Sequence, residues 1–254
     1  MLLAIDVGNT NITLGVFEGE ELKASWRLAA DVNRLRDEYG VLMVNLLEHE
    51  GIGPEQIDAA VMASVVPDLD PVFEAVCRRY FGVQPLMVGA GVRTGLRILY
   101  DSPRDVGADR VADAVAAIKL YGKPLILVDL GTATVFDAIS KEGDYLGGAI
   151  APGLVIAAEA LFQRAARLYR VELATPASTI GRNTVAAVQA GVIFGYVSLV
   201  EGIVRRFKEE LGEEAKVVAT GGWAELVAQE TDVIDVVDTD LTLTGLRFIY
   251  EMNC

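Results

Sequence analysis

The feature that most constrains this chain is a residue pattern that occurs twice, about half the chain apart. Residues 3–8 read Leu-Ala-Ile-Asp-Val-Gly and residues 126–131 read Ile-Leu-Val-Asp-Leu-Gly, so Asp129 lies 123 positions after Asp6. In both copies an apolar, β-branched run ends at an acid and a glycine. Polar residues then lead into a second apolar run, which is typical of strand, tight turn and strand. A repeat at this spacing indicates the duplication of one structural unit.

The two turns have the composition of phosphate-binding turns. At the constant spacing, Asn9-Thr10-Asn11 corresponds to Thr132-Ala133-Thr134, and both triplets follow a glycine. Amide and hydroxyl donors, together with main-chain N–H groups at a bend, form a cup for a phosphate. Asp6 would then bind a phosphate-bound Mg²⁺, directly or through water, and Asp129 would hold a second cation. The alternatives are a hairpin with a polar turn at Asp6 and an acid that caps the following turn at Asp129.

The predicted elements repeat in the same order after a boundary close to residue 120, so we expect two α/β domains, residues 1–120 and 121–254. The first would contain a three-strand meander over residues 2–29, helices 36–50, 71–81 and 111–121, strands 57–66 and 84–88, and an irregular segment 89–106. The second would contain strands 125–130, 133–140, 144–151, 216–220 and 233–237, and helices 154–168, 184–211, 223–230 and 241–253.

Composition excludes several classes of protein. The 254 residues are 52% hydrophobic and carry a formal net charge of −14, which argues against nucleic-acid binding. No run reaches the roughly 18 apolar residues of a membrane span, and the N-terminus lacks the basic region of a signal peptide. The two cysteines, Cys77 and Cys254, have no metal-ligand spacing and are expected to be free thiols. We therefore expect a cytoplasmic protein that binds neither nucleic acid nor membrane.

Phosphoryl transfer also needs a group that orients the acceptor hydroxyl, and Asp109 in Gly107-Ala108-Asp109-Arg110 is the candidate. A helix N-terminus and an adjacent arginine favour the ionised carboxylate, which is then a ready proton acceptor. The alternative is a first-turn acid that the helix dipole stabilises. Thr184 most simply caps the long helix that follows it. Gly221-Gly222, between a strand and a helix, suits an adenine or ribose passing close to the main chain.

Four segments occur here in the order that the type III pantothenate kinase family shows, and the chain resembles that family over nearly its whole length. They are residues 6–11, residues 107–110, residues 129–134 and the segment Gly147-Gly148-Ala149-Ile150-Ala151-Pro152-Gly153. The family belongs to the acetate and sugar kinase, Hsp70 and actin superfamily. The resemblance implies an α/β fold of two duplicated ribonuclease H-like (actin-like) ATPase domains with a nucleotide cleft between them. It also implies ATP-dependent phosphorylation of pantothenate to 4′-phosphopantothenate, the first step of coenzyme A biosynthesis.

The resemblance further implies roles for individual residues. Asp109 would be the catalytic proton acceptor, Asp6 would lie near Mg²⁺, and Asp129 would bind the monovalent cation, K⁺ or ammonium. The chain would act as a homodimer in which Thr184 reaches the substrate from the partner subunit. The implied ATP contacts are Asp6, Val7, Gly8, Asn9, Thr10, Asn11, Ile12, Thr13 and Thr132. The implied pantothenate contacts are Tyr100, Gly107, Ala108, Asp109, Arg110 and Thr184.

Two other functions stay open at this point. One is a sugar or acetate kinase of the same superfamily, which would differ in its acceptor. The other is a non-catalytic, nucleotide-sensing regulator, as in relatives that resemble Bvg accessory factor. The presence of both Asp109 and Asp129 favours a kinase over a regulator.

Overall fold

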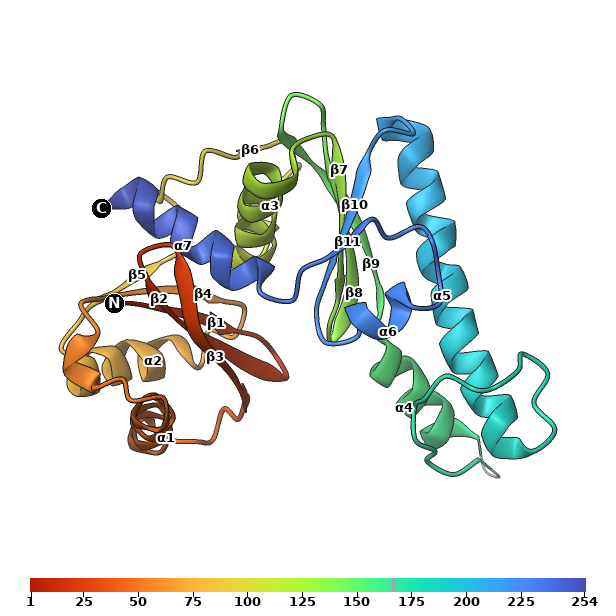
Figure 1. Cartoon of the computed structure of the whole chain (residues 1–254), viewed down its shortest axis with the longest axis horizontal. Helices are drawn as coiled ribbons and strands as arrows, with labels where there is room; N and C mark the ends of the chain where they lie inside the picture. The colour runs from red at the N-terminus through yellow and green to blue at the C-terminus, as the bar shows by residue number, and fades with distance from the viewer. Residues whose placement is uncertain (166–167) are drawn as a thin grey trace. The chain divides into compact units, whose positions relative to one another are not determined.

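The computed structural model describes residues 1–165 and 168–254, and the chain divides into two compact units. The first unit comprises Met1–Leu96, Asp101–Ala116 and Asp240–Cys254. The second comprises Arg97–Tyr100 and Ala117–Thr239. Each unit is built on one mixed β-sheet (Figure 1).

The sheet of the first unit has the order β3-β2-β1-β4-β5. Strands β1, β2 and β3 form an antiparallel meander, and β4 and β5 then run parallel to β1. The central strands β1 and β4 are almost continuously apolar and buried, whereas the edge strand β3 alternates exposed and half-buried residues, as its one-sided packing requires. The bounds are β1 (Leu2–Val7), β2 (Asn11–Glu18), β3 (Glu21–Ala29), β4 (Ala59–Ser64) and β5 (Pro85–Met87).

Helices α1 and α2 pack against each other and cover the apolar core of the first sheet (Figure 1). The last helix, α7 (Leu241–Asn253), packs on β1, β2 and β4 of the same sheet. Its Leu243 reaches Gly15, and the Arg247 guanidinium lies 5.6 Å from the centroid of the Phe17 ring. The other helical elements here are α1 (Arg36–His49), η1 (Pro54–Gln56), α2 (Asp70–Val76), the π-helical turn η2 (Cys77–Phe81), η3 (Pro103–Asp105) and α3 (Ala108–Tyr121), whose residues 108–116 belong to this unit.

The sheet of the second unit repeats the arrangement of the first and adds one strand at its edge. Its order is β11-β10-β7-β8-β9-β6, in which β7, β8 and β9 form the antiparallel meander and β10 and β11 run parallel to β7. The duplicated fold predicted from the two Asp-x-Gly segments is therefore confirmed. The bounds are β6 (Arg97–Ile98), β7 (Leu125–Leu130), β8 (Ala133–Ile139), β9 (Asp144–Pro152), β10 (Lys216–Thr220) and β11 (Val236–Val237).

The core of the second unit lies between this sheet and the long helix α5 (Thr184–Leu211), whose buried face carries Ile193, Val197 and Val200. Beside α5 packs α4 (Leu154–Arg164), and α6 (Ala224–Ala228) follows β10 (Figure 1). By length and composition α5 could cross a membrane, with a mean hydropathy of 1.7 and 39% of the tested window buried. Its apolar residues serve a protein core here, and the exposed positions of its first half carry small residues, whereas those of its second half carry arginine and glutamate.

Some elements differ from the sequence prediction. The helix expected over 154–168 ends at Arg164, and residues 166–167 of that prediction lie outside the described residues. The segment 89–106 is not wholly irregular, because it contains β6 and η3. The helix over 241–253 has the expected bounds but belongs to the first unit, whereas the predicted boundary placed it with residues 121–254. The nucleotide cleft that the resemblance implies stays a prediction.

Candidate functional site

The first Asp-x-Gly turn lies at the end of β1. Asp6 pairs with Thr13 on β2 and with Ala63 on β4, so it stands on a central strand with a neighbour on each side. The N–H of Gly8 donates to the carbonyl of Asn11 at 3.0 Å, and the carbonyl of Thr10 accepts from the N–H of Ala30 at 2.9 Å. Residues 9–11 are exposed. The result is a closed turn that presents amide and hydroxyl groups to solvent, as a phosphate cup requires.

The segment Gly107–Arg110 lies at the same end of this sheet. The N–H of Val65, directly after β4, donates to the carbonyl of Val7 at 3.0 Å, which places Val65 beside the first turn. A Cβ atom on Gly107 would lie 3.3 Å from the Cγ1 of Val65. Within the first unit the fold therefore brings the turn of Asp6 and the start of α3 to the carboxyl ends of β1 and β4.

The carboxylate of Asp109 folds back over the start of its own helix. Its Oδ1 accepts the N–H of Arg110 at 2.8 Å, and a Cβ atom on Gly107 would lie only 2.3 Å from the same oxygen. Any side chain at position 107 would displace this carboxylate. Gly107 is thus required for the observed position of Asp109, which explains the glycine in the predicted motif.

The second Asp-x-Gly turn lies at the end of β7 and is one residue shorter than the first. Gly131 N–H donates to the carbonyl of Ala133 at 3.1 Å, so that Thr132 alone forms the bend, whereas Gly8 bonds to Asn11 across two residues. Asp129 pairs with Val135 on β8 and with Thr220 on β10. In the first strand of each hairpin, equivalent residues are therefore 123 positions apart, as Asp6 and Asp129 are. In the second strand the spacing is 122, because Thr13 pairs with Asp6 and Val135 pairs with Asp129.

Two glycines let the main chain approach the carboxylate of Asp129 closely. A Cβ atom on Gly131 would lie 3.2 Å from its Oδ1, and one on Gly221 would lie 2.4 Å from the same oxygen. Gly221 also has a φ of +91°, which residues with a side chain rarely adopt. In residues 1–165 and 168–254 no group of three or more His, Cys, Asp or Glu side chains is arranged to hold a metal ion. A cation at Asp129 would therefore complete its shell with main-chain, substrate or water oxygens, which suits K⁺ and Mg²⁺ rather than zinc.

The segment Gly147–Gly153 forms the end of β9 and the N-cap of α4. A Cβ atom on Gly153 would lie 2.2 Å from the carbonyl oxygen of Thr132 and 2.6 Å from that of Gly131. The N-terminus of α4 is thus in direct contact with the second turn, where its unpaired N–H groups favour an anion. The fold explains why this glycine-rich segment accompanies the second Asp-x-Gly turn in the sequence.

A buried pair of hydroxyl groups behind the second turn was not predicted. The hydroxyls of Thr134 and Tyr196 lie 2.5 Å apart, and Thr134 also donates to the carbonyl of Pro152 at 3.3 Å. Burial raises the pKa of Tyr196 to about 12; the hydrogen bond with Thr134 opposes this shift, and the negative charge of Asp129 adds to it. Tyr196 therefore keeps its proton. In the sequence it reads only as a core residue of α5, and no local pattern distinguishes it.

The two remaining predicted residues, Tyr100 and Thr184, occupy different places in the second unit. Tyr100 follows β6 and lies edge-on to Tyr145, with ring centroids 6.5 Å apart. Thr184 is exposed at the first turn of α5 and lines a cavity of about 590 Å³, which no other predicted site residue lines. The expectation that Thr184 caps its helix is wrong, because the side chain of Asn183 is the cap and accepts the N–H of Ala186 at 2.9 Å.

Comparison with solved structures supports the fold. A Baf family transcriptional activator from Campylobacter jejuni, so described, superposes with a TM-score of 0.63 at 20% identity over 99% of this chain and 98% of that one. A protein from Sinorhizobium meliloti described as a 2-dehydro-3-deoxygalactonokinase superposes with a TM-score of 0.60 at 10% identity, over 99% of this chain and 96% of that one. The ethanolamine utilization protein EutJ from Carboxydothermus hydrogenoformans superposes with a TM-score of 0.55 at 17% identity, over 97% of this chain and 89% of that one. Identities this low establish the shared fold and nothing more.

Comparison with protein families carries the assignment further. Residues 2–206 match the family described as type III pantothenate kinase. The match includes both Asp-x-Gly turns, the segment around Asp109 and the glycine-rich segment before α4. Since it spans most of the sequence, the chain belongs to the type III pantothenate kinase family.

Proposed function

We propose that this kinase transfers the γ-phosphoryl group of ATP to the primary hydroxyl of pantothenate and uses Asp109 as the proton acceptor. The products are 4′-phosphopantothenate and ADP, which makes the reaction the first step of coenzyme A biosynthesis. Family membership supports the reaction. The observation that carries the residue assignment is that the first unit brings the turn of Asp6 and the carboxylate of Asp109 to the ends of the same two strands.

In the proposed mechanism, Asp109 holds the acceptor hydroxyl in line with the γ-phosphorus. The hydroxyl oxygen forms the new bond to phosphorus while the bond from phosphorus to the β–γ bridging oxygen breaks, and the hydroxyl proton moves to the Asp109 carboxylate. In a loose transition state the base acts mainly by positioning the nucleophile. Gly107 contributes because its missing side chain leaves the carboxylate in place.

The proposed ATP contacts are residues 6–13 of the first turn and Thr132 of the second. Mg²⁺ bound to the phosphates would supply neutralisation of their negative charge, and Asp6 fits it because Mg²⁺ in kinases takes one or two carboxylates in addition to phosphate oxygens. The monovalent cation, K⁺ or ammonium, is assigned to Asp129. The support is that Gly131 and Gly221 let the main chain come close to that carboxylate, so that main-chain oxygens can share a cation with it.

The proposed pantothenate contacts are Tyr100, Gly107, Ala108, Arg110 and Thr184, in addition to Asp109. We assign Thr184 to the site of the partner subunit of a homodimer. The support is the exposed face of α5, where Gly191 and Gly195 have no neighbouring atom within 4 Å of a Cβ position. Small side chains there permit a close approach of two helices. Cytoplasmic location is part of the proposal and agrees with the two free cysteines.

Replacement of Asp109 by asparagine tests the assignment, with Asp105→Asn as its control. Asp105 is an exposed carboxylate four residues earlier, in η3. With ATP, Mg²⁺, K⁺ and pantothenate, we expect Asp109→Asn to lose a factor of about 10²–10⁴ in kcat, because the general base is gone. Asp105→Asn should keep wild-type turnover, and ATP binding, measured by calorimetry, should persist in both variants. Wild-type turnover in Asp109→Asn would refute the role of this residue.

The same assay separates the alternatives. Turnover of a sugar or of acetate in place of pantothenate would point to another kinase of the superfamily. ATP binding without transfer to any acceptor would favour a nucleotide-sensing regulator. Omission of K⁺ and ammonium tests the cation assignment, and activity that does not depend on either ion would remove it.

A further inference from the structure

Tyr100 closely follows a strand pairing of only two residue pairs. Strand β6 contains two residues, Arg97 and Ile98, which pair in parallel with Asp144 and Tyr145 at the edge of the sheet. One more main-chain bond follows, from the N–H of Leu99 to the carbonyl of Tyr145 at 2.8 Å. Pairings this short are marginal by themselves. The position of Tyr100, the next residue, therefore depends on additional contacts.

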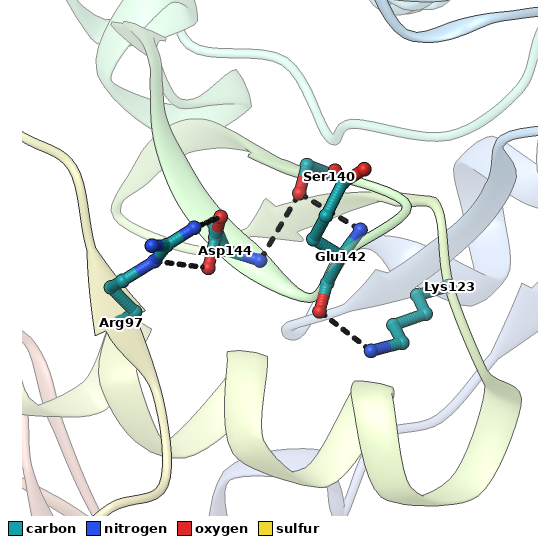
Figure 2. A network of polar contacts seen from close by, with 5 residues as sticks. All are labelled: Arg97, Lys123, Ser140, Glu142 and Asp144. Carbon is teal, nitrogen blue, oxygen red and sulfur yellow. Dashed lines mark hydrogen bonds and ion pairs between the residues drawn. The ribbon is translucent and has the colours of Figure 1, made fainter.

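The strongest of these contacts is an ion pair at the first pair of the register (Figure 2). The Nε of Arg97 donates to the Oδ1 of Asp144 at 2.7 Å, and a terminal nitrogen of Arg97 donates to its Oδ2, so the pair is bidentate. Bidentate arginine–carboxylate pairs fix geometry as well as adding energy. The side chain of Asp144 is only 12% exposed, and the Arg97 hydrogen bonds hold its pKa below the usual range.

The other side of the pair is a braced turn between β8 and β9. The hydroxyl of Ser140 accepts the N–H groups of Glu142 and Asp144, at 3.1 and 3.2 Å (Figure 2). Lys123 donates to the carbonyl of Glu142 at 2.6 Å. The main chain at Asp144 is thus held by hydrogen bonds, and Arg97 joins to it a chain segment that has little regular structure.

The register set by this pair, continued beyond β6, predicts that Tyr100 lies against Gly147. If Ile98 pairs with Tyr145, a continuation by two residues brings position 100 to position 147. The side-chain contacts agree, because a Cβ atom on Gly147 would lie 3.4 and 3.5 Å from the Cδ2 and Cε2 of Tyr100. Tyr145, which lies edge-on to the Tyr100 ring, is buried, and its hydroxyl donates to Asp137 at 2.6 Å. A slip of the register would move the ring off this surface.

We propose that Arg97 is a positioning residue for the acceptor substrate, and that its ion pair with Asp144 fixes the register of β6 and thereby holds the Tyr100 ring against Gly147. The inference rests on the proposed function in one respect, namely that Tyr100 contacts pantothenate. Arg97 itself touches no substrate. Its side chain acts through the strand register, so the ion pair affects substrate affinity and leaves the transfer step unchanged.

Arg97→Ala tests the proposal, with Arg93→Ala as its matched control. Arg93 is an exposed arginine of the same segment, but its contacts to Asn253 are made by its main chain and survive the substitution. In Arg97→Ala we expect the KM for pantothenate to rise about threefold to fivefold, the range that loss of an ion pair with an exposed arginine produces. The kcat and the KM for ATP should stay within about twofold of wild type, and Arg93→Ala should match wild type in all three constants.

Hydrogen exchange gives a readout that does not depend on turnover. The amide of Leu99 should exchange faster in Arg97→Ala than in Arg93→Ala, because its bond to Tyr145 opens more often when the ion pair is lost. Unchanged exchange would overturn the register role, whatever the kinetics. If the wild-type protein phosphorylates no pantothenate, the proposed function fails and the substrate role of Arg97 fails with it, while the exchange result still decides the register role.

A double-mutant cycle shows whether Arg97 acts through Tyr100. Tyr100→Ala should raise the KM for pantothenate by itself, and adding Arg97→Ala to that variant should cause no further rise. Two independent, multiplying effects would overturn the proposal, because Arg97 would then act by another route. Faster exchange at Leu99 combined with an unchanged KM in Arg97→Ala would also overturn it.

Discussion

At the scale of single residues, Gly221 shows how the second turn depends on missing side chains. Its φ of +91° is unfavourable for any other residue, and its Cβ position lies 2.4 Å from the Oδ1 of Asp129 and 2.7 Å from the main-chain carbon of Leu130. A methyl group here cannot be accommodated by rotation of a flexible side chain alone. The backbone of β7 or of the turn must move, and the carboxylate of Asp129 must move with it.

We therefore expect Gly221→Ala to lower the free energy of unfolding by about 2–4 kcal/mol, from backbone strain and overpacking together. It should also weaken activation by K⁺, which a titration of activity against K⁺ concentration measures. The matched control is Gly122→Ala, at a φ of +85° with no atom within 4 Å of the Cβ position. In that variant the free energy of unfolding, measured with urea, should fall by only about 1–2 kcal/mol, and activation by K⁺ should stay as in wild type. Equal effects of the two substitutions would contradict the argument from space at Asp129.

At the scale of elements, the N-terminus of α5 separates a stabilising residue from a proposed functional one. Asn183 caps the helix through its side chain, and the exposed Thr184 follows it. We expect Asn183→Ala to lower the free energy of unfolding by about 1 kcal/mol, because one N–H of the first turn loses its acceptor. Thr184→Ala should leave stability within about 0.5 kcal/mol of wild type and raise the KM for pantothenate.

Thermal unfolding and steady-state kinetics on the two adjacent variants give both readouts. A loss of stability in Thr184→Ala as large as that in Asn183→Ala would mean that the cap is wrongly assigned. An unchanged KM in Thr184→Ala would remove this threonine from the proposed site and leave the cap assignment intact.

The elements also show which parts of the structure the sequence could predict. The bounds of β7, α5 and α7 were predicted to the residue, because hydrophobic periodicity and capping signals are local. Strand β6 was missed because its two residues carry no pattern of their own, and its pairing depends on Asp144, which lies 47 residues away from Arg97 in the sequence. The start of β8 at Ala133 was predicted correctly, but the change of spacing from 123 to 122 was not, since the pairing of β7 with β8 decides the register.

The candidate site divides in the same way. The segments of Asp6, Asp109 and Asp129 were identified from short motifs, and the structure adds the reason for the neighbouring glycines at positions 107, 131 and 221. Tyr196 could not be found, because its bond to Thr134 joins residues 62 positions apart. Local chemistry is readable from the sequence, whereas the partners that fix it are set by the tertiary fold.

At the scale of the whole molecule, the chain begins and ends in the same unit. Helix α7, which contains the last residues of the chain, packs on β1, β2 and β4, and its Leu243 is 1% exposed and reaches Gly15. The sequence prediction assigned this helix to residues 121–254, because a boundary drawn from the sequence divides the chain into continuous segments. The structure instead makes the first sheet depend on residues that follow the entire second unit.

This arrangement predicts that Leu243→Ala destabilises the first unit selectively. The substitution should lower the free energy of unfolding by about 2–5 kcal/mol, because a buried leucine side chain is removed. In native-state hydrogen exchange, amides of β1 and β4 should lose protection, while amides of β7 and β10 in the second unit should keep theirs, since the two units open separately. Met252→Ala, at an exposed position of the same helix, should leave the free energy of opening of both sheets within about 0.5 kcal/mol of wild type. Equal loss of protection in both sheets would show instead that the two units unfold together as one cooperative body.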